Sequence, residues 1–298
     1  IKNFADRLVD AVRGKNSRVV VGLDPRLESL PPEFPRGTPG DPEGAARAIL
    51  DFNSEILGIV APHAAAVKPQ IAFYEKLGPA GLAAYIETCR RARGRGLLVI
   101  GDVKRGDVPD TAAAYAEAHL GSLPCDAVTV NPFFGTDGID PFVKVASATG
   151  NGIFVLVKTS NPRSGEIQDL PVEGKPLYLH LASRVAAWGA SLRGESGYSS
   201  VGAVVGATHP RQAAEIRAAL PGAFFLVPGC GAQGAGSAGL KPCFNADALG
   251  AVVNSSRGIT FAWEKGPCKG MPWREAVAKA VVDMKKDINQ ALGLGPGD

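Results

Sequence analysis

Two carboxylates and a lysine follow an apolar run in the first half of the chain. Residues 97–100 are apolar, and Asp102, Lys104 and Asp107 come after them. In a parallel α/β protein such a run is typical of a buried strand, and charges at its carboxyl end lie at the mouth of a site. Asp102 and Lys104 should meet as an ion pair, because residues two apart on a strand share a face. Asp107 lies beyond the strand and faces this site or a neighbouring subunit's. An ordinary ion pair at a solvated strand end is the alternative interpretation.

Two more charged residues lie in or after strand-like segments. Lys68 falls within AAAVKPQIAFYE, residues 64–75, which we predict to be a strand. A lysine inside a buried strand needs either a route to water or a negative partner. Asp24 ends the β-branched run RVVVGLD, residues 18–24. In one parallel sheet, Asp24 would lie at the same edge as Asp102.

A glycine-rich stretch and a later arginine indicate a phosphate site. GCGAQGAG, residues 229–236, has little side-chain bulk, so its backbone N–H groups can approach an anion closely. Taken alone, the stretch is equally compatible with a flexible loop. Arg257, in NSSRG, favours phosphate, because barrels commonly bind phosphate with the loops after strands seven and eight. Gln233 could bridge the phosphate to the rest of a ligand and let the loop close as a lid.

Eight strand-like runs alternate with helical segments, and no linker-like break separates them. This alternation predicts an α/β fold, a (β/α)8 TIM barrel in a single domain over residues 1–298. A doubly wound open sheet is the competing architecture, but no G-x-G-x-x-G follows the first run, and polar residues end nearly every run. The side chains expected at the converging carboxyl ends are Asp24, Asp102, Lys104, Ser160, Pro228 and Arg257.

Helix signals flank several of these runs. The start of the chain, about residues 3–13, reads as an amphipathic helix. Asp41 followed by Pro42 is typical of a helix start. Thr208 is expected to cap the helix that has Pro210 in its first turn.

Three segments are expected outside the regular elements. The C-terminal tail, about residues 293–298, is predicted to be short and flexible. The loops 31–44 and 161–176 are rich in turn residues and unusually long. Loops of this length are often functional lids.

Composition excludes several classes of protein. The chain has 298 residues, of which 45% are hydrophobic, and its formal net charge is only +3. With no long basic run and no stretch of roughly 18 apolar residues, neither nucleic acid nor a membrane is an expected partner. An odd number of cysteines without a C-x-x-C pair favours reduced thiols in a cytoplasmic enzyme and no metal site. The cysteines are Cys89, Cys125, Cys230, Cys243 and Cys268.

Several conspicuous residues stay outside the predicted site. The histidines are scattered and are expected at the surface or at helix ends: His63, His119, His180 and His209. The tryptophans are expected to pack helices on the barrel: Trp188, Trp263 and Trp273. Lys158, near Ser160, faces either the mouth or a helix, and we leave it out of the site.

Taken together, these motifs resemble orotidine 5′-phosphate decarboxylase, in particular its longer bacterial (type 2) branch. The resemblance covers residues 18–258 and rests on DVKRGD at 102–107, VGLDPRL, VKPQIAFYE, VKTSNP, VPGCGAQG and NSSRG. It implies conversion of orotidine 5′-monophosphate to uridine 5′-monophosphate and carbon dioxide, the last step of de novo pyrimidine synthesis. It also implies that no metal or organic cofactor is needed.

The resemblance further implies a role for each residue in a homodimer. Lys68, Asp102, Lys104 and Asp107 of the partner subunit would form an alternating charge network, with Lys104 as the proton donor to C6 of the ring. Asp24 and Lys68 of the same chain would hold the ribose, which Thr111 of the partner subunit would also reach. Ser160 would contact the pyrimidine, Gln233 and Arg257 would hold the phosphate, and Pro228 would lie against the base or lid.

Two other functions remain open at this point. D-x-K-x-x-D also occurs in sister enzymes of the same barrel superfamily, which act on sugar phosphates through a metal-stabilised enediolate. Such an enzyme would need a further acidic ligand near the mouth and would be sensitive to chelators. A non-catalytic nucleotide-binding barrel is the other possibility. It is disfavoured because a binding protein gains nothing from a carboxylate buried beside an anionic ligand.

Overall fold

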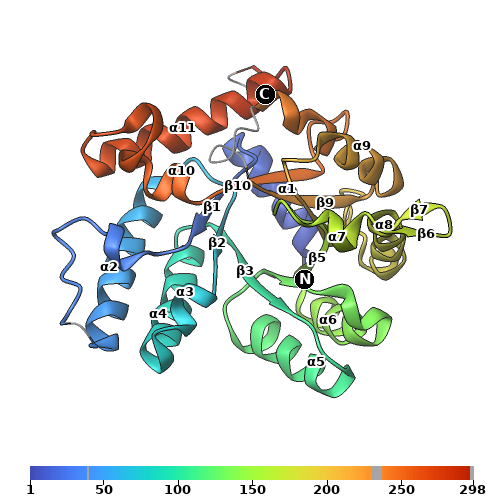
Figure 1. Cartoon of the computed structure of the whole chain (residues 1–298), viewed down its shortest axis with the longest axis horizontal. Coiled ribbons are helices and arrows are strands. Elements are labelled where there is room, and N and C mark those ends of the chain that lie inside the picture. The colour runs from blue at the N-terminus through green and yellow to red at the C-terminus, as the bar shows by residue number, and fades with distance from the viewer. Residues whose placement is uncertain (39, 230–236, 296–298) are drawn as a thin grey trace.

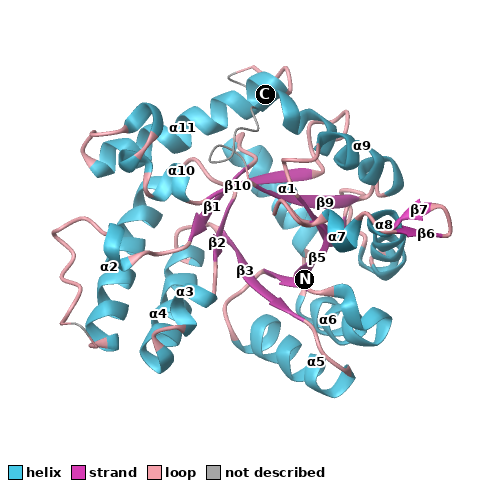
Figure 2. Cartoon of the chain, viewed as in Figure 1, coloured by secondary structure: helices cyan, strands magenta, loops and turns pink. Residues whose placement is uncertain are grey.

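The computed structural model describes residues 1–38, 40–229 and 237–295. Eight strands within this part of the chain form a closed parallel barrel with helices around it (Figures 1 and 2). The order around the barrel is β1-β10-β9-β8-β5-β4-β3-β2, so the predicted (β/α)8 barrel is confirmed. The barrel strands are β1 Val19–Leu23, β2 Ala66–Pro69, β3 Leu98–Arg105, β4 Ala127–Val130, β5 Gly152–Lys158, β8 Ser199–Val205, β9 Ala223–Pro228 and β10 Ala251–Ser255. A separate antiparallel pair consists of β6 Pro171–Val172 and β7 Lys175–Pro176.

Helices lie outside the barrel, between successive strands (Figure 2). The longer helices are α1 Phe4–Lys15, α2 Pro42–Val60, α4 Gly78–Arg93, α5 Pro109–Ala116, α6 Gly135–Thr149, α8 Leu177–Trp188, α9 Pro210–Ala219 and α11 Trp273–Ala291. The short helices are α3 Ala72–Glu75, α7 Gly165–Gln168 and α10 Arg257–Thr260. Further helical turns span Leu27–Ser29, Glu117–Ser122, Pro132–Phe134, Ala190–Leu192, Ser237–Cys243, Ala262–Glu264 and Gly266–Cys268. None of the described helices is long and apolar enough to cross a membrane.

α1 packs against one end of the barrel. Phe4 and Leu8 are buried in the same apolar cluster as Phe154, which lines the barrel interior. The rings of Phe4 and Phe154 meet edge to face, with centroids 5.8 Å apart. A side chain at Gly152, the first residue of β5, would collide with Phe4, so α1 lies at the amino ends of the strands. The predicted site residues therefore lie at the opposite end.

α11, which follows the barrel, is fixed by aromatic packing. Trp273, its first residue, packs on Phe52 of α2 with ring centroids 5.6 Å apart and on Trp263 at 5.9 Å. Both tryptophans thus pack helices together as predicted. The last residues of the predicted tail, 296–298, lie outside the described residues.

Both predicted helix starts are confirmed, with Pro42 and Pro210 in the first turns of α2 and α9, but one of the two predicted caps is wrong. Asp41 caps α2, because its Oδ1 accepts a hydrogen bond from the Gly44 N–H at 2.9 Å. The residue that precedes α9 is His209, and it makes no side-chain cap bond. Thr208 does not cap this helix, since its hydroxyl donates instead to the Ser160 carbonyl at 3.4 Å.

The prediction of one strand over residues 64–75 is wrong in its second half. β2 ends at Pro69, and a helical turn, α3, follows from Ala72. Tyr74 in this turn is fully buried, and its hydroxyl accepts a hydrogen bond from the Asn53 amide at 2.9 Å. A short apolar run does not distinguish a strand from a buried helical turn, which explains the error.

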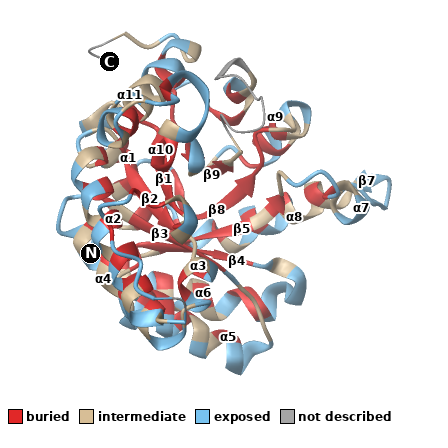
Figure 3. Ribbon diagram, turned by 60° about the vertical axis from the view of Figure 1, so that its left-hand side comes forward, coloured by how far each residue is buried: buried red, intermediate tan, exposed pale blue. Residues whose placement is uncertain are grey.

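The long loop at residues 161–176, here called the arm, extends away from the barrel body (Figure 3). It contains α7 and the β6–β7 pair. Two contacts tie it to the end of β5. Lys158 Nζ pairs with Asp169 at 2.7 Å, and the Thr159 N–H donates to the Gln168 side chain at 2.9 Å. Lys158 therefore faces the arm.

His119 differs from the other histidines in its burial. It lies at a helix end, as predicted, but it is 4% exposed, whereas His63, His180 and His209 are partly exposed. Burial, with a smaller contribution from the Arg105 charge, lowers the pKa of His119 from 6.5 to about 4. The folded protein thus keeps this imidazole neutral over a range in which an unfolded chain would protonate it.

His119 should therefore make the folded state less stable as the pH falls from about 6.5 to 4. Within this window the unfolded chain takes up a proton that the folded chain does not, so acid favours unfolding. Between pH 7 and pH 5 the wild-type protein should lose about 2 kcal/mol more of its free energy of unfolding than His119→Gln. Urea unfolding at both pH values measures the difference. An equal pH dependence in the two proteins would mean that His119 is hydrated in the folded state.

Candidate active site

Lys68, Asp102 and Lys104 form a continuous chain of charges at the carboxyl ends of β2 and β3. Lys68 Nζ donates to Asp102 Oδ2 at 2.6 Å, and Lys104 Nζ donates to Asp102 Oδ1 at 2.5 Å. Each carboxylate oxygen thus binds one ammonium group. The predicted pairing of Asp102 with Lys104 is confirmed. The negative partner that Lys68 required is the same carboxylate.

The charge chain runs from the barrel interior to the surface. Lys68 and Asp102 are 4% and 7% exposed, whereas the Lys104 side chain is 46% exposed. Burial alone would raise the pKa of Asp102, but the two ammonium groups hold that pKa well below its usual range. Burial would lower the pKa of Lys68, yet the charges of Asp102 and Asp24 raise it. The buried Lys68–Asp102 pair therefore stays ionised at neutral pH.

The backbone of β3 is irregular where it carries these side chains. Its pairing with β4 shifts register between Gly101 and Arg105. Within this bulge Lys104 has a φ of 45°, in the left-handed region, which costs a residue with a Cβ about 1 kcal/mol. Bulges next to active sites commonly re-aim a side chain. Here the bulge turns Lys104 back onto the Asp102 carboxylate.

Asp24 and Asn254 add buried acceptors near this cluster. Each has an Oδ1 atom that is buried without a hydrogen-bond partner among the described residues. A buried oxygen left without a donor destabilises a protein, so such atoms point to a donor that the protein itself does not supply. Asp24 was predicted and follows β1. Asn254, at the end of β10, was missed, although it stands in the NSSRG motif.

Asp107 and Thr111 lie apart from the charge chain of their own subunit. Asp107 Oδ1 accepts a hydrogen bond from the Val108 N–H at 2.7 Å. Within the described part of the chain, Asp107 forms no ion pair with Lys68 or Lys104. Thr111 is exposed in the first turn of α5. Neither residue is brought into the cluster by its own chain.

Ser160 follows β5 and Pro228 ends β9, two strands that β8 separates in the barrel. A side chain at Gly229 would lie 3.4 Å from the Ser160 Cβ. Pro228 pairs in register with Asn254 of β10. The backbone after β9 thus comes close to Ser160.

The predicted phosphate ligands are only partly described. Arg257 is exposed at the start of α10, directly after β10, and forms no ion pair with a described residue. Its guanidinium is available to an anion. Gln233, Cys230 and the rest of residues 230–236 lie outside the described residues.

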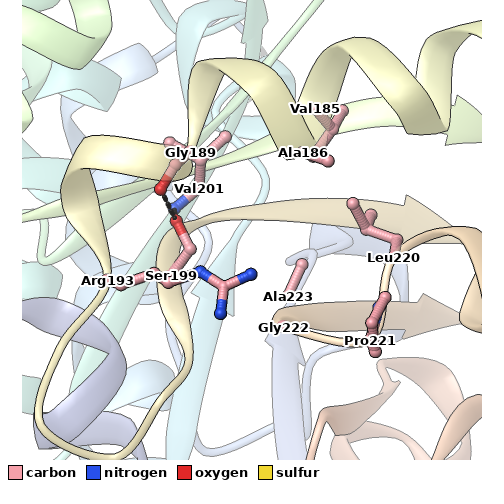
Figure 4. A pocket seen from close by; sticks show the side chains of 10 residues that line it. All are labelled: Val185, Ala186, Gly189, Arg193, Ser199, Val201, Leu220, Pro221, Gly222 and Ala223. Carbon is pink, nitrogen blue, oxygen red and sulfur yellow. Dashed lines mark hydrogen bonds between the residues drawn. The ribbon is translucent and has the colours of Figure 1, made fainter.

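Two other features do not contribute to the site. The cavity in Figure 4, between α8 and the amino ends of β8 and β9, lies at the opposite end of the barrel and is lined in part by Arg193, Ser199 and Gly222. Its volume of about 30 Å³ corresponds to a single water molecule. Among the described residues, no three His, Cys, Asp or Glu side chains come together as metal ligands would.

A closed parallel barrel with ionised lysine and aspartate side chains at the carboxyl ends of its strands has the architecture of a TIM-barrel enzyme. Residues 17–266 match the model of the orotidine 5′-phosphate decarboxylase / HUMPS family. The chain belongs to this family.

Full-length relatives support this assignment. The chain is 43% identical to an orotidine 5′-phosphate decarboxylase from Rhodopirellula baltica, over 96% of this chain and 98% of the relative. It is 41% identical to the enzyme of the same name from Deinococcus radiodurans, over 98% of both chains. The structure of Leishmania donovani OMP decarboxylase superposes on this chain with a TM-score of 0.78 at 33% sequence identity. The superposition covers 98% of this chain and 100% of that one.

The buried ion pair should control stability as well as chemistry. Asp102→Ala leaves the Lys68 ammonium unpaired in the barrel and should lower the free energy of unfolding by about 3–5 kcal/mol. Lys68→Met combined with Asp102→Leu should recover most of this loss, because it removes both buried charges. Urea unfolding at pH 7 measures the three proteins.

The exposed pair Lys279–Asp283, at 2.6 Å, provides the control. Asp283→Ala should cost less than about 1 kcal/mol, because water already solvates both charges. If Asp102→Ala cost no more than Asp283→Ala, the Lys68 ammonium would have access to water that its burial in the folded structure does not suggest.

Proposed function

We propose that this enzyme decarboxylates orotidine 5′-monophosphate to uridine 5′-monophosphate, with Lys104 as the proton donor and without a cofactor. Membership of the family and the relatives of the same name support the reaction. The observation that carries the residue assignment is the charge chain in which Asp102 binds Lys68 and Lys104 at 2.6 and 2.5 Å. We place the enzyme in the cytoplasm, where pyrimidine nucleotides are made.

In the proposed reaction, the bond between C6 and the carboxylate breaks and carbon dioxide leaves. The bonding electrons stay on C6 in an orbital that the ring does not delocalise. The Lys104 ammonium stabilises this developing carbanion and then transfers a proton from Nζ to C6. Neutral Lys104 regains a proton from water, which completes the cycle. No oxidation or reduction takes place.

The fixed charges favour the transition state over the bound substrate. Asp102 would lie beside the substrate carboxylate, and two anions at that distance repel each other. The repulsion disappears as the departing group becomes neutral carbon dioxide, while attraction to Lys104 grows. Asp102 has to remain ionised for this effect. Its two ammonium partners provide that condition, since they lower its pKa.

The remaining residues bind the parts of the substrate that do not react. Asp24 and Lys68 hold the ribose hydroxyls, which would satisfy the buried Asp24 oxygen that has no donor within the described part of the chain. Ser160 contacts the pyrimidine, and Pro228 lies against the base. Arg257 and Gln233 bind the phosphate. Phosphate binding far from the reacting bond raises turnover as well as affinity when it holds the reacting groups in place.

The proposed active form is a homodimer in which Asp107 and Thr111 serve the partner's site. Asp107 makes no ion pair with Lys68 or Lys104 in the described part of its own chain, and Thr111 is exposed. Large apolar side chains beside them support an interface. Val108, Phe133 and Phe134 are 52%, 87% and 44% exposed. Exposed apolar groups of this size commonly mark protein contacts.

Lys104→Ala should abolish decarboxylation while binding of uridine 5′-monophosphate survives in part, because the variant keeps the phosphate and ribose contacts. The assay follows the loss of ultraviolet absorbance of orotidine 5′-monophosphate with a chelator present. Lys144→Ala, at an exposed position on α6, is the matched control and should be fully active. Near-normal turnover in Lys104→Ala would refute the assigned role. Inactivation of the wild-type enzyme by the chelator would favour the metal-dependent sister activity instead.

Mixing two inactive variants tests the shared site. Lys104→Ala and Asp107→Ala chains should each be inactive alone, and subunit exchange should restore up to about one quarter of wild-type activity. Half of the dimers would be hybrids, and each hybrid would have one intact site. Isotopically distinct chains followed by native mass spectrometry demonstrate the exchange. Complete exchange without recovery would place Asp107 in the site of its own chain.

A further inference from the structure

The bulge in β3 leaves two backbone amides without strand partners at the point where the charge chain is built. Gly101 pairs with Val128 of β4, and the next pair is Arg105 with Val130. β3 therefore uses four residues to cover the distance that β4 covers in two. The backbone amides of Val103 and Lys104 belong to these extra residues of β3, and each amide needs a hydrogen-bond acceptor.

One side chain, Thr129, satisfies both amides and also binds the carboxylate. Its Oγ1 accepts from the Val103 N–H at 3.0 Å and from the Lys104 N–H at 2.9 Å. Its hydroxyl donates to Asp102 Oδ1 at 3.1 Å. A hydroxyl group has one donor and two acceptor positions, so this residue uses its full capacity within the bulge.

Thr129 is buried, and three hydrogen bonds within the bulge occupy its hydroxyl. It is 1% exposed, between Val128 and Val130 on β4. The oxygen of Asp102 that it binds is the one that also accepts from Lys104 Nζ. Thr129 thus touches the backbone of Lys104, whose φ is 45°, and the carboxylate that fixes the other end of the same side chain.

We infer that Thr129 is a positioning residue that holds Lys104 and Asp102 in their reactive arrangement by bonding the bulged backbone and the carboxylate at once. This inference rests on the proposed function, because it assigns Thr129 a task in that reaction. Without the hydroxyl, two buried amides lose their acceptor and the left-handed backbone at Lys104 loses its support. The chain around Lys104 would relax, and its ammonium would move away from the reacting carbon.

The test compares Thr129→Val, which keeps the shape but removes the hydroxyl, with Thr129→Ser, which keeps the hydroxyl. In Thr129→Val, kcat for orotidine 5′-monophosphate should fall by about 10- to 100-fold, while KM changes by less than about threefold. Thr129→Ser should stay within about threefold of the wild-type kcat. Thr88→Val, which removes another buried hydroxyl on α4, is the control and should keep the wild-type kcat.

Each outcome decides the inference. An unchanged kcat in Thr129→Val, an equal fall in Thr129→Ser, or a fall expressed only in KM would overturn it. An inactive wild-type enzyme would refute the proposed function instead. If Thr129→Val fails to fold, Thr129→Ala takes its place. A crystal structure of the folded variant should show Lys104 outside the left-handed region, and an unmoved Lys104 would contradict the inference.

Discussion

The structure depends on the attraction between one buried carboxylate and two lysines at the carboxyl end of the barrel. Burial of either the Asp102 carboxylate or the Lys68 ammonium alone would destabilise the folded state. At 2.6 Å the two opposite charges compensate each other. The pair fixes two strand ends relative to each other and keeps both groups charged. Lys104 extends the same network outward, to where a ligand can reach it. Stability and proposed chemistry therefore rest on one electrostatic arrangement.

The barrel supplies the rigidity that this arrangement needs. α1 packs against the amino ends of the strands, and apolar side chains fill the interior below the charges. Water is thereby kept from the inner face of the Lys68–Asp102 pair, which strengthens its attraction. The mouth, in contrast, has an interrupted strand pairing, a lysine with left-handed backbone, and two buried oxygens, of Asp24 and Asn254, that have no donor among the described residues. The strained Lys104 backbone and these buried oxygens thus lie at the end where a substrate is proposed to bind.

Sequence reasoning anticipated the parts that follow from local pattern and charge. Alternating apolar runs and helices predicted the barrel, and the lysine in an apolar strand predicted a negative partner for Lys68. It missed Thr129, because strand register and bulges depend on pairing between distant segments. It also missed the burial of His119, since nothing local distinguishes a packed imidazole from a surface one. The helical turn after Lys68 was missed because its apolar residues suit a strand equally well. The subunit whose site Asp107 serves was not predictable either, because contacts between subunits do not follow from local sequence pattern.

The most direct test of the proposed role of Lys104 and Asp102 is a crystal structure of the protein with uridine 5′-monophosphate bound. C6 of the pyrimidine should lie next to Lys104 Nζ, at about hydrogen-bonding distance, with Asp102 between the two lysines and the phosphate on Arg257. Asp107 of the partner subunit should lie beside the same ring. A nucleotide bound with C6 directed away from Lys104, or in another cavity, would mean that this charge chain does not act on the substrate.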